Sequence, residues 1–494
     1  MGALPPTGRW VRLEVPASAV NLEGGIVKGM GFVLYDGRAT FDTAGLRQPN
    51  FAAWQQEEFT SAELADAAIS GPDAIVGIDG LSNAAKYALG LEAAQNAVAP
   101  LPRLDFTGSE WQEDFTRPAN RSDVTLLVEI SSDLVNWTRS GVTLERLAAS
   151  PLETWRAHYP LNSAGRIFSR HQIAVAGAHA VNLVPTGALQ FAINAGSVVT
   201  PVTTPLAIPL TGTPEIAGAP VGRVSAVTSS TITVSGANWI AGALSMPALP
   251  HAFRFVTGPA AGLTFMITAN TSDTVSTSGV DLAQYGIRAG SGGDIVRIVP
   301  VDTLNTLFGA GMFLGGTNAS EADIVTLSGT VQLSYYYNTS LGRWVRTTGP
   351  TTDRGNTPIP AEAEISITRK AAAVTLTISG RVPDVPFAEL VANSGSTFTH
   401  AGFPTDTTLG ALSLQTALTG WVSNPTAANA DTLSIANGAG WISYFHNGTH
   451  WQRTTGPATN RDGIVLPAGT PILIFKRGSA SGTSLLQRAL PYTP

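Results

Sequence analysis

The sequence of 494 residues contains no cysteine, which excludes disulfide bonds, thiol nucleophiles and metal sites built on thiolates. Charged residues are scarce as well: Asp, Glu, Lys and Arg make up only 13%, against about 25% in average chains. The net charge of −6 has no basic run behind it, so the positive surface that binds a phosphate backbone is missing. We therefore expect no nucleic-acid partner.

Long apolar runs are missing too. No stretch reaches the roughly 18 apolar residues that span a bilayer, and the first residues, MGALPP, lack the basic start and apolar segment of a signal peptide. We expect no membrane span and no export signal in this chain.

The common catalytic motifs are also absent, namely HExxH, GxSxG, the P-loop and GxGxxG. We predict that the protein is not an enzyme and that it holds no cofactor. A hydrolase built on two carboxylates outside any motif stays open, because the chain has 35 acidic residues whose separation in space a sequence does not reveal.

The residues that are present favour strands. Glycine (51) and proline (32) are abundant, and threonine and valine recur in short runs, a pattern typical of short strands joined by tight turns. The length is too great for one ordinary core. We predict a mainly β, multidomain chain of β-sandwich or β-barrel modules. One short helical segment is expected near residues 51–92, where the apolar spacing changes to that of two short helices around a loop.

The clearest internal signal is a duplication. Tyr335-Tyr-Tyr-Asn338 followed by Arg343-Trp-Val-Arg-Thr-Thr-Gly-Pro350 recurs as Tyr444-Phe-His-Asn447 followed by His450-Trp-Gln-Arg-Thr-Thr-Gly-Pro457. The repeat length of roughly 107 residues is that of a duplicated domain rather than of a solenoid unit. Asp323 and Asp431 also recur, each before an apolar strand, and we interpret both as turn residues.

Four aromatic residues of this duplicated hairpin are the candidate ligand-binding residues: Tyr336, Trp344, Phe445 and Trp451. Aromatic faces on exposed strands can stack on sugar rings. The alternative interpretation is that Trp344 and Trp451 are core residues of two homologous domains, because tryptophan buries a large apolar area.

Three stretches carry a resemblance to known families. Trp10-Val-Arg-Leu-Glu-Val15 and Gly31-Phe-Val-Leu-Tyr35 resemble the closing strands of a galactose-binding-like jelly roll of large secreted proteins from the Verrucomicrobia–Planctomycetes group. Ser131-Ser-Asp-Leu-Val-Asn-Trp137 is similar to a fibronectin-III-like module of the same proteins. Residues 185–494 resemble an uncharacterised family of this group, through both Trp-x-Arg-Thr-Thr-Gly-Pro copies and the ending Leu490-Pro-Tyr-Thr-Pro494.

The resemblance implies an extracellular or cell-surface location, and a jelly roll whose earlier strands are absent from this chain. With the residue patterns it divides the chain into six segments: remnant jelly-roll strands (1–50), a helical pair (51–95), a fibronectin-III-like β-sandwich (96–180), a β-barrel or β-sandwich module (181–300), and two copies of a β repeat (301–400 and 401–494).

The helical pair of these secreted proteins carries a calcium loop, which Asp79-Gly-Leu-Ser-Asn83 resembles. An EF-hand-like loop takes oxygen ligands at positions 1, 3, 5, 9 and 12, with glycine at position 6. If Asp79 and Gly80 take positions 5 and 6, positions 1, 3 and 12 fall on residues without a carboxylate: Ile75, Gly77 and Lys86. We therefore predict no metal site, with Asp79 and Asn83 as remnants of a degenerate loop.

These observations favour a secreted or cell-surface, non-enzymatic structural protein. It would be adhesive or self-assembling, as a component of a surface layer, filament or matrix. The expected partners are further copies or other surface proteins, because unpaired strand edges template additional strands unless they are blocked. The alternative is a carbohydrate-binding accessory module of an extracellular polysaccharide-degrading system, with glycans as partners.

Overall fold

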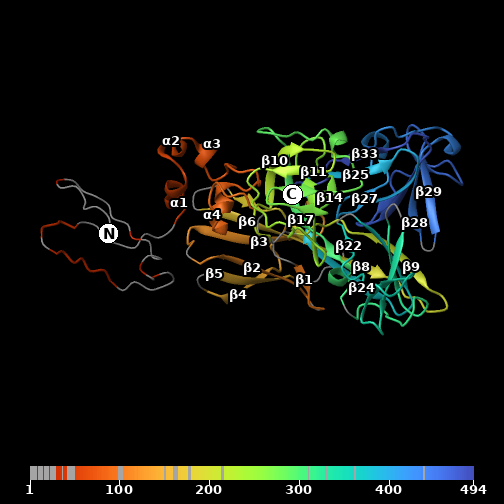
Figure 1. Ribbon diagram of the computed structural model, residues 1–494, viewed down its shortest axis with the longest axis horizontal. Coiled ribbons are helices and arrows are strands. Elements are labelled where there is room, and N and C mark those ends of the chain that lie inside the picture. The colour runs from red at the N-terminus through yellow and green to blue at the C-terminus, as the bar shows by residue number, and fades with distance from the viewer. Residues whose placement is uncertain are drawn as a thin grey trace.

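The computed structural model describes most of the chain after residue 49. The described ranges are 50–97, 104–108, 110–119, 121–149, 152–159, 165–175, 180–212, 216–309, 311–328, 332–360, 363–437 and 440–494, with short pieces between residues 8 and 41. Antiparallel sheets dominate these residues (Figure 1), which confirms the prediction of a mainly β, multidomain chain.

Of the two strands predicted near the N-terminus, residues 10–14 lie outside the described part of the chain. Residues 31–35 are described and form no strand, and the side chains of Val33 and Tyr35 are 95% and 96% exposed. An alternating sequence becomes a stable strand only when neighbouring strands or a helix cover one of its faces. The described residues supply no such cover here, so the strand prediction for 31–35 is corrected.

The helical segment consists of short helices separated by turns rather than of two helices. In the described residues of this segment they are α1 (Phe51–Glu58), α2 (Ser61–Leu64), α3 (Ala67–Ser70) and α4 (Asn83–Leu89). Side-chain caps fix where they begin: Asn50 accepts a hydrogen bond from the first turn of α1, and Thr60 forms a capping box with Glu63. Trp54 and Tyr87 join these helices to the strands that follow. No helix in the described residues has the length and apolarity to cross a bilayer.

A β-sandwich follows the helices. Its first sheet has the order β1-β2-β5-β4, from β1 (Leu104–Phe106), β2 (Trp111–Pro118), β4 (Thr143–Ala148) and β5 (Leu152–Tyr159). Its second sheet has the order β24-β8-β6-β3, with β7 beside β6, from β3 (Val124–Ser131), β6 (Arg166–Val175), β7 (Val181–Asn182), β8 (Thr186–Ile193) and β24 (Val374–Arg381). Trp111, Ile130 and Tyr159 are part of the core between the sheets. The sandwich predicted for 96–180 is present, but its second sheet continues into later strands.

Residues 216–300 form a separate sheet of the order β12-β13-β17-β10-β11-β16-β15, with β14 beside β13. Its elements are β10 (Val221–Val227), β11 (Thr231–Val234), β12 (Ser245–Met246), β13 (Leu249–Phe255), β14 (Thr264–Met266), β15 (Ala269–Asn270), β16 (Thr274–Ser276), η2 (Leu282–Tyr285) and β17 (Ile295–Pro300). The turn at residues 258–262 docks this sheet on the rest of the chain. Gly262 has φ 93°, and a Cβ there would lie 2.1 Å from the carbonyl oxygen of Pro386, so only glycine fits this contact.

Two further groups of strands have the same order, β21-β20-β19-β23-β9 and β30-β29-β28-β32-β26. The first group and its flanking elements are β9 (Val202–Ala207), β18 (Asp302–Thr303), α5 (Leu304–Leu307), β19 (Ile324–Leu327), β20 (Leu333–Asn338), β21 (Arg343–Arg346), β22 (Pro358–Ile359) and β23 (Glu364–Arg369). The second group is β25 (Phe387–Ala392), β26 (Gly395–His400), β27 (Thr407–Thr408), α6 (Leu414–Ala417), η3 (Ala427–Asn429), β28 (Thr432–Asn437), β29 (Gly440–His446), β30 (Trp451–Arg453), β31 (Val465–Leu466), β32 (Pro471–Lys476) and β33 (Thr483–Arg488).

Strand pairing shifts the predicted boundaries of the two copies. β9 pairs with β23 as β26 pairs with β32, and β8 pairs with β24 as β25 pairs with β33. We therefore define repeat 1 as residues 186–207 and 302–381, repeat 2 as residues 387–488, and the insert as residues 216–300. The segments predicted at 181–300, 301–400 and 401–494 need this correction because the insert separates the first two strands of repeat 1 from the others.

Candidate functional site

The four aromatic residues predicted to bind a ligand are buried. Tyr336 and Trp344 of repeat 1 are 2% and 3% exposed, and Phe445 and Trp451 of repeat 2 are 5% and 1% exposed. The two tryptophans belong to the cores of their repeats, as the alternative interpretation expected. Because none of these rings presents an open face to solvent, stacking on a sugar there would require the hairpin to leave its core.

The loop that resembles a calcium site contains an internal cation. Lys86 Nζ lies 3.3 Å from Asp79 Oδ2, and both side chains are fully buried. The same ammonium donates to the carbonyl oxygens of Ala93 and Gln95, at 2.7 and 2.9 Å. Asn83, the other predicted remnant, donates its amide to two backbone carbonyls. Within the described residues, no group of three His, Asp or Glu side chains is placed to hold a metal ion.

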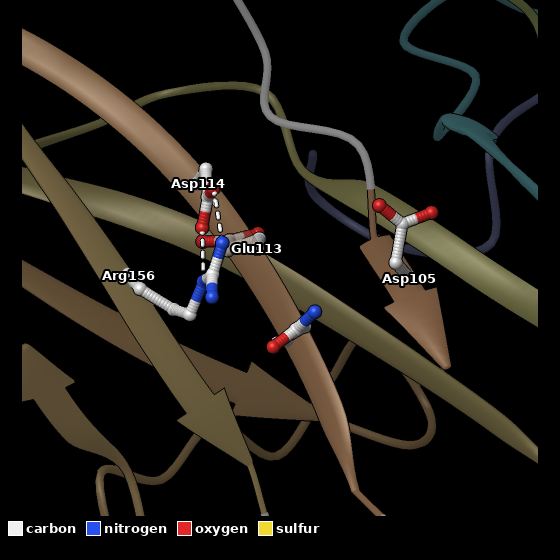
Figure 2. Close-up of a pocket in the computed structure, with 5 residues that line it drawn as sticks. Asp105, Glu113, Asp114 and Arg156 are labelled. Atoms are coloured by element: carbon white, nitrogen blue, oxygen red, sulfur yellow. Dashed lines mark hydrogen bonds and ion pairs between the residues drawn. The ribbon is translucent and has the colours of Figure 1, made fainter. Parts of the chain in front are cut away.

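A small cavity of about 160 Å³ on the sandwich is the place to look for a catalytic carboxylate pair (Figure 2). It is lined by Asp105, Gln112, Glu113, Asp114 and Arg156. Arg156 donates two hydrogen bonds to Asp114, at 2.6 and 2.7 Å. This pairing lowers the pKa of Asp114 and keeps its carboxylate ionised.

Two further carboxylates line this cavity, Asp105 and Glu113, and Glu113 belongs to the sandwich interior. Glu113 is 1% exposed, and its Oε1 lies 3.0 Å from Ser169 Oγ and 2.8 Å from His171 Nε2. Consecutive residues of a strand point to opposite faces of the sheet. Glu113 and Asp114 therefore do not face one another across a shared bond, which a hydrolase pair requires.

The outer face of the repeat 2 sheet has a different character. Its inner face packs Leu433, Ile472 and Ile474 into the core, whereas the alternate positions carry large apolar side chains toward solvent. We call this surface the aromatic face, and it consists of Phe398, Trp441, Leu473 and Phe475. Trp441 is 42% exposed and Phe475 is 38% exposed. The ring centroids of Phe398 and Trp441 lie 6.0 Å apart. Figure 1 shows β28 and β29 at the end of the molecule far from helices α1 to α3.

Repeat 1 shows that the fold does not need these aromatic residues. The four equivalent positions, which follow from the matching strand registers, hold a proline and three polar residues: Pro205, Gln332, Ser366 and Thr368. Hydroxyl groups bond to one another on that sheet, as between Thr203 and Thr368 at 2.9 Å. The large apolar side chains are thus a property of repeat 2 alone.

A sequence signal for this face exists, although the sequence analysis missed it. Ile365-Ser-Ile-Thr368 of repeat 1 corresponds to Ile472-Leu-Ile-Phe475 of repeat 2. The isoleucines that face the core are kept, while the alternate positions change from hydroxyl to apolar side chains. Comparison of the two copies at period 2 would have identified the changed face.

An open groove of about 460 Å³ lies where the two repeats meet. Its walls come from β8 and β9 of repeat 1, from β28 and β29 of repeat 2, and from residues 464–471. Ala436, the register partner of Trp441, is one of the lining residues. Ile435, Ile442 and Tyr444 also line the groove, and they alternate with the residues of the aromatic face, so most of this wall belongs to the inner face of the sheet. Among the described residues that line it, none is acidic or basic.

The sequence matches no model of a known protein family and no curated protein.

Proposed function

We propose that the protein is a non-enzymatic structural protein of the cell exterior that attaches to a surface through the aromatic face of repeat 2. The observation that carries this proposal is the exposure of Trp441 and Phe475 on a sheet whose counterpart in repeat 1 is polar. Exposed apolar patches commonly mark binding surfaces. Their burial on contact is favourable by roughly 25 cal/mol per Å².

Features of the edge strands favour attachment through a face rather than through an edge. β4 is one of the edge strands of the sandwich, and all six of its residues are exposed. It carries the charges of Glu145 and Arg146, and its register with β5 shifts between Arg146 and Ala148. Charges and bulges on an edge strand oppose pairing with another chain. Assembly by strand addition at β4 is thus less favoured than the sequence suggested.

The surroundings of the carboxylates support a non-enzymatic role. The cavity of Figure 2 has three carboxylates in its lining, and its Asp114 is held by Arg156. A general acid needs a raised pKa, whereas the pKa of Asp114 is lowered. Attachment to a surface requires no general acid, so the lowered pKa of Asp114 is compatible with it.

Sedimentation with insoluble bacterial cell envelopes tests the proposal. We expect the wild-type protein to sediment with the envelopes and the double variant Trp441→Gln/Phe475→Thr, which carries the repeat 1 residues, to stay in solution. Leu147→Thr is the matched control, because Leu147 is an apolar side chain of similar exposure, 43%, on the sandwich. Equal sedimentation of the wild type and the double variant would refute attachment through this face.

A further inference from the structure

We infer that the aromatic face binds a neutral polysaccharide, with sugar rings stacked on Trp441, Phe475 and Phe398. This inference rests on the proposed attachment function and names the ligand class of the same surface. Its basis is the mixture of side chains on the face, the absence of charge along it, and its size.

The aromatic face offers both kinds of contact that a sugar requires. A pyranose ring presents C–H groups on its faces and hydroxyl groups around its edge, so it needs apolar rings and hydrogen-bonding groups side by side. Ser396 is exposed and is the register partner of Phe475. Ser434 and Ser443 lie between the aromatic positions of β26 and β29 and bond to one another at 2.7 Å.

Charge on and around the face selects a neutral ligand. Arg477 is the basic residue beside Phe475, with its guanidinium 5.6 Å from the ring centroid. That guanidinium already donates to the carbonyl oxygens of Ala427 and Ala430. Phe398, Trp441, Leu473 and Phe475 are uncharged, and Arg477 supplies one positive charge at the border of the face. A chain with a charge on each sugar would lose hydration with at most one opposite charge in return, which is costly, whereas an uncharged chain of sugars loses less.

The size of the face favours sugar rings over a second protein. Trp441 and Phe475 are 42% and 38% exposed, so together with half-buried Phe398 they offer on the order of 250 Å² of ring surface. A stable protein interface buries about 800 Å² on each partner. Two or three stacked sugar rings match the smaller area.

Native gel electrophoresis of the full chain in gels that contain one polysaccharide each tests the inference. The neutral probes are hydroxyethyl cellulose, xyloglucan, glucomannan and laminarin, and the acidic probe is polygalacturonate. We expect retardation of the wild type in at least one neutral gel and none in polygalacturonate. Trp441→Gln and Phe475→Thr should each weaken the affinity roughly tenfold, the worth of one aromatic contact. Leu147→Thr should migrate as the wild type does, and circular dichroism checks that every variant is folded.

Several outcomes would overturn the inference. They are no retardation in any neutral gel, retardation in polygalacturonate alone, or equal retardation of the wild type and both face variants. If the gels show nothing while envelope sedimentation still depends on Trp441 and Phe475, the attachment function stands and the ligand is not a neutral polysaccharide. If light scattering shows a dimer that the two substitutions dissociate, the face joins two copies, and the inference is wrong.

Discussion

Repeat 1 and repeat 2 differ on the faces that meet solvent, whereas they share one buried aspartate that accepts hydrogen bonds from equivalent backbone amides. Asp323 and Asp431, which we interpreted as turn residues, are buried in their repeats, and each accepts hydrogen bonds from two backbone amides. In both repeats these bonds tie a loop before the sheet to the end of a sheet strand. The outer faces keep no such likeness, as Ser366 and Thr368 correspond to Leu473 and Phe475.

The comparison teaches which residues the fold requires. A buried carboxylate that loses its donors costs free energy that no solvent contact restores. A residue on an exposed sheet face can change while the core on the other side stays the same. The two repeats therefore share the buried pairing and differ in their outer surfaces.

The largest effect is expected where the repeats treat equivalent arginines differently. Arg381 of repeat 1 pairs with Asp384, which also receives two hydrogen bonds from Arg297, at 2.8 and 2.9 Å, whereas Arg488 of repeat 2 donates to a backbone carbonyl. Burial opposes ionisation of Asp384, but the two guanidinium groups outweigh it and hold the pKa of Asp384 well below its usual range. Burial lowers the pKa of Arg381 to about 10.

Asp384→Asn should lower the free energy of unfolding by about 3–5 kcal/mol, because two buried guanidinium groups lose their counter-charge. The stability that Asp384 provides is present above the pKa of about 3.9 of an unfolded aspartate and is lost as the pH falls below it. Urea unfolding measures both effects. The exposed pair Arg166–Asp406 is the control, and Asp406→Asn should cost no more than about 1 kcal/mol. Equal losses for the two variants would contradict the assignment.

A second comparison separates the two recurring aspartates. Asp323 also pairs with the Arg369 guanidinium, whereas the residue equivalent to Arg369 in repeat 2, Lys476, donates to the carbonyl oxygen of Thr419. Asp323→Asn should therefore cost about 3 kcal/mol, since it breaks a buried ion pair. Asp431→Asn should cost about 1–2 kcal/mol, for weakened bonds to amides. Urea unfolding midpoints of the two variants measure the difference, and a larger loss at Asp431 would refute this reading.

The third comparison concerns pH. His400 of repeat 2 takes the place of Ala207 in repeat 1. Burial, together with the charges of Arg488 and Arg254, lowers the pKa of His400 to about 3. Between about pH 6.5 and pH 3, His400 is therefore protonated in the unfolded chain and neutral in the folded protein. Stability should fall by about 1.4 kcal/mol per pH unit as the pH drops from about 6.5 toward 3.

Unfolding measured at several pH values between 7 and 4 tests this, with His400→Ala as the variant. His400 Nδ1 accepts a hydrogen bond from the amide of Gly402, at 3.0 Å, so the variant is expected to be less stable at neutral pH. Its stability should nevertheless depend less on pH than that of the wild type. A slope as steep as that of the wild type would show that other groups cause the acid loss.

The smallest effect is expected on the aromatic face. Trp441→Gln and Phe475→Thr place repeat 1 residues on the repeat 2 sheet, and we expect stability to change by no more than about 0.5 kcal/mol each, as for other exposed positions. Thermal unfolding measures this. A loss of several kcal/mol would mean that the aromatic residues stabilise the fold. The conclusion drawn from repeat 1, that the fold does not need them, would then be wrong.

The sequence determined much of the local structure. The abundance of glycine and proline and the short runs of threonine and valine predicted short strands joined by tight turns, because these preferences depend only on near neighbours, and the antiparallel sheets confirm a mainly β chain. The duplicated hairpin indicated two homologous domains. The core role of Trp344 and Trp451 was one of two interpretations that the sequence left open.

Tertiary structure decided the rest. β9 belongs to repeat 1 because it pairs with β23, on the far side of the insert. Lys86 stabilises its loop because Asp79 and two carbonyl groups surround its ammonium. Alternation also shows that a strand has two faces, yet it does not show which face other elements cover. Tyr336 and Trp441 are both aromatic residues of sheet strands, and only packing buries the first and leaves the second in contact with water.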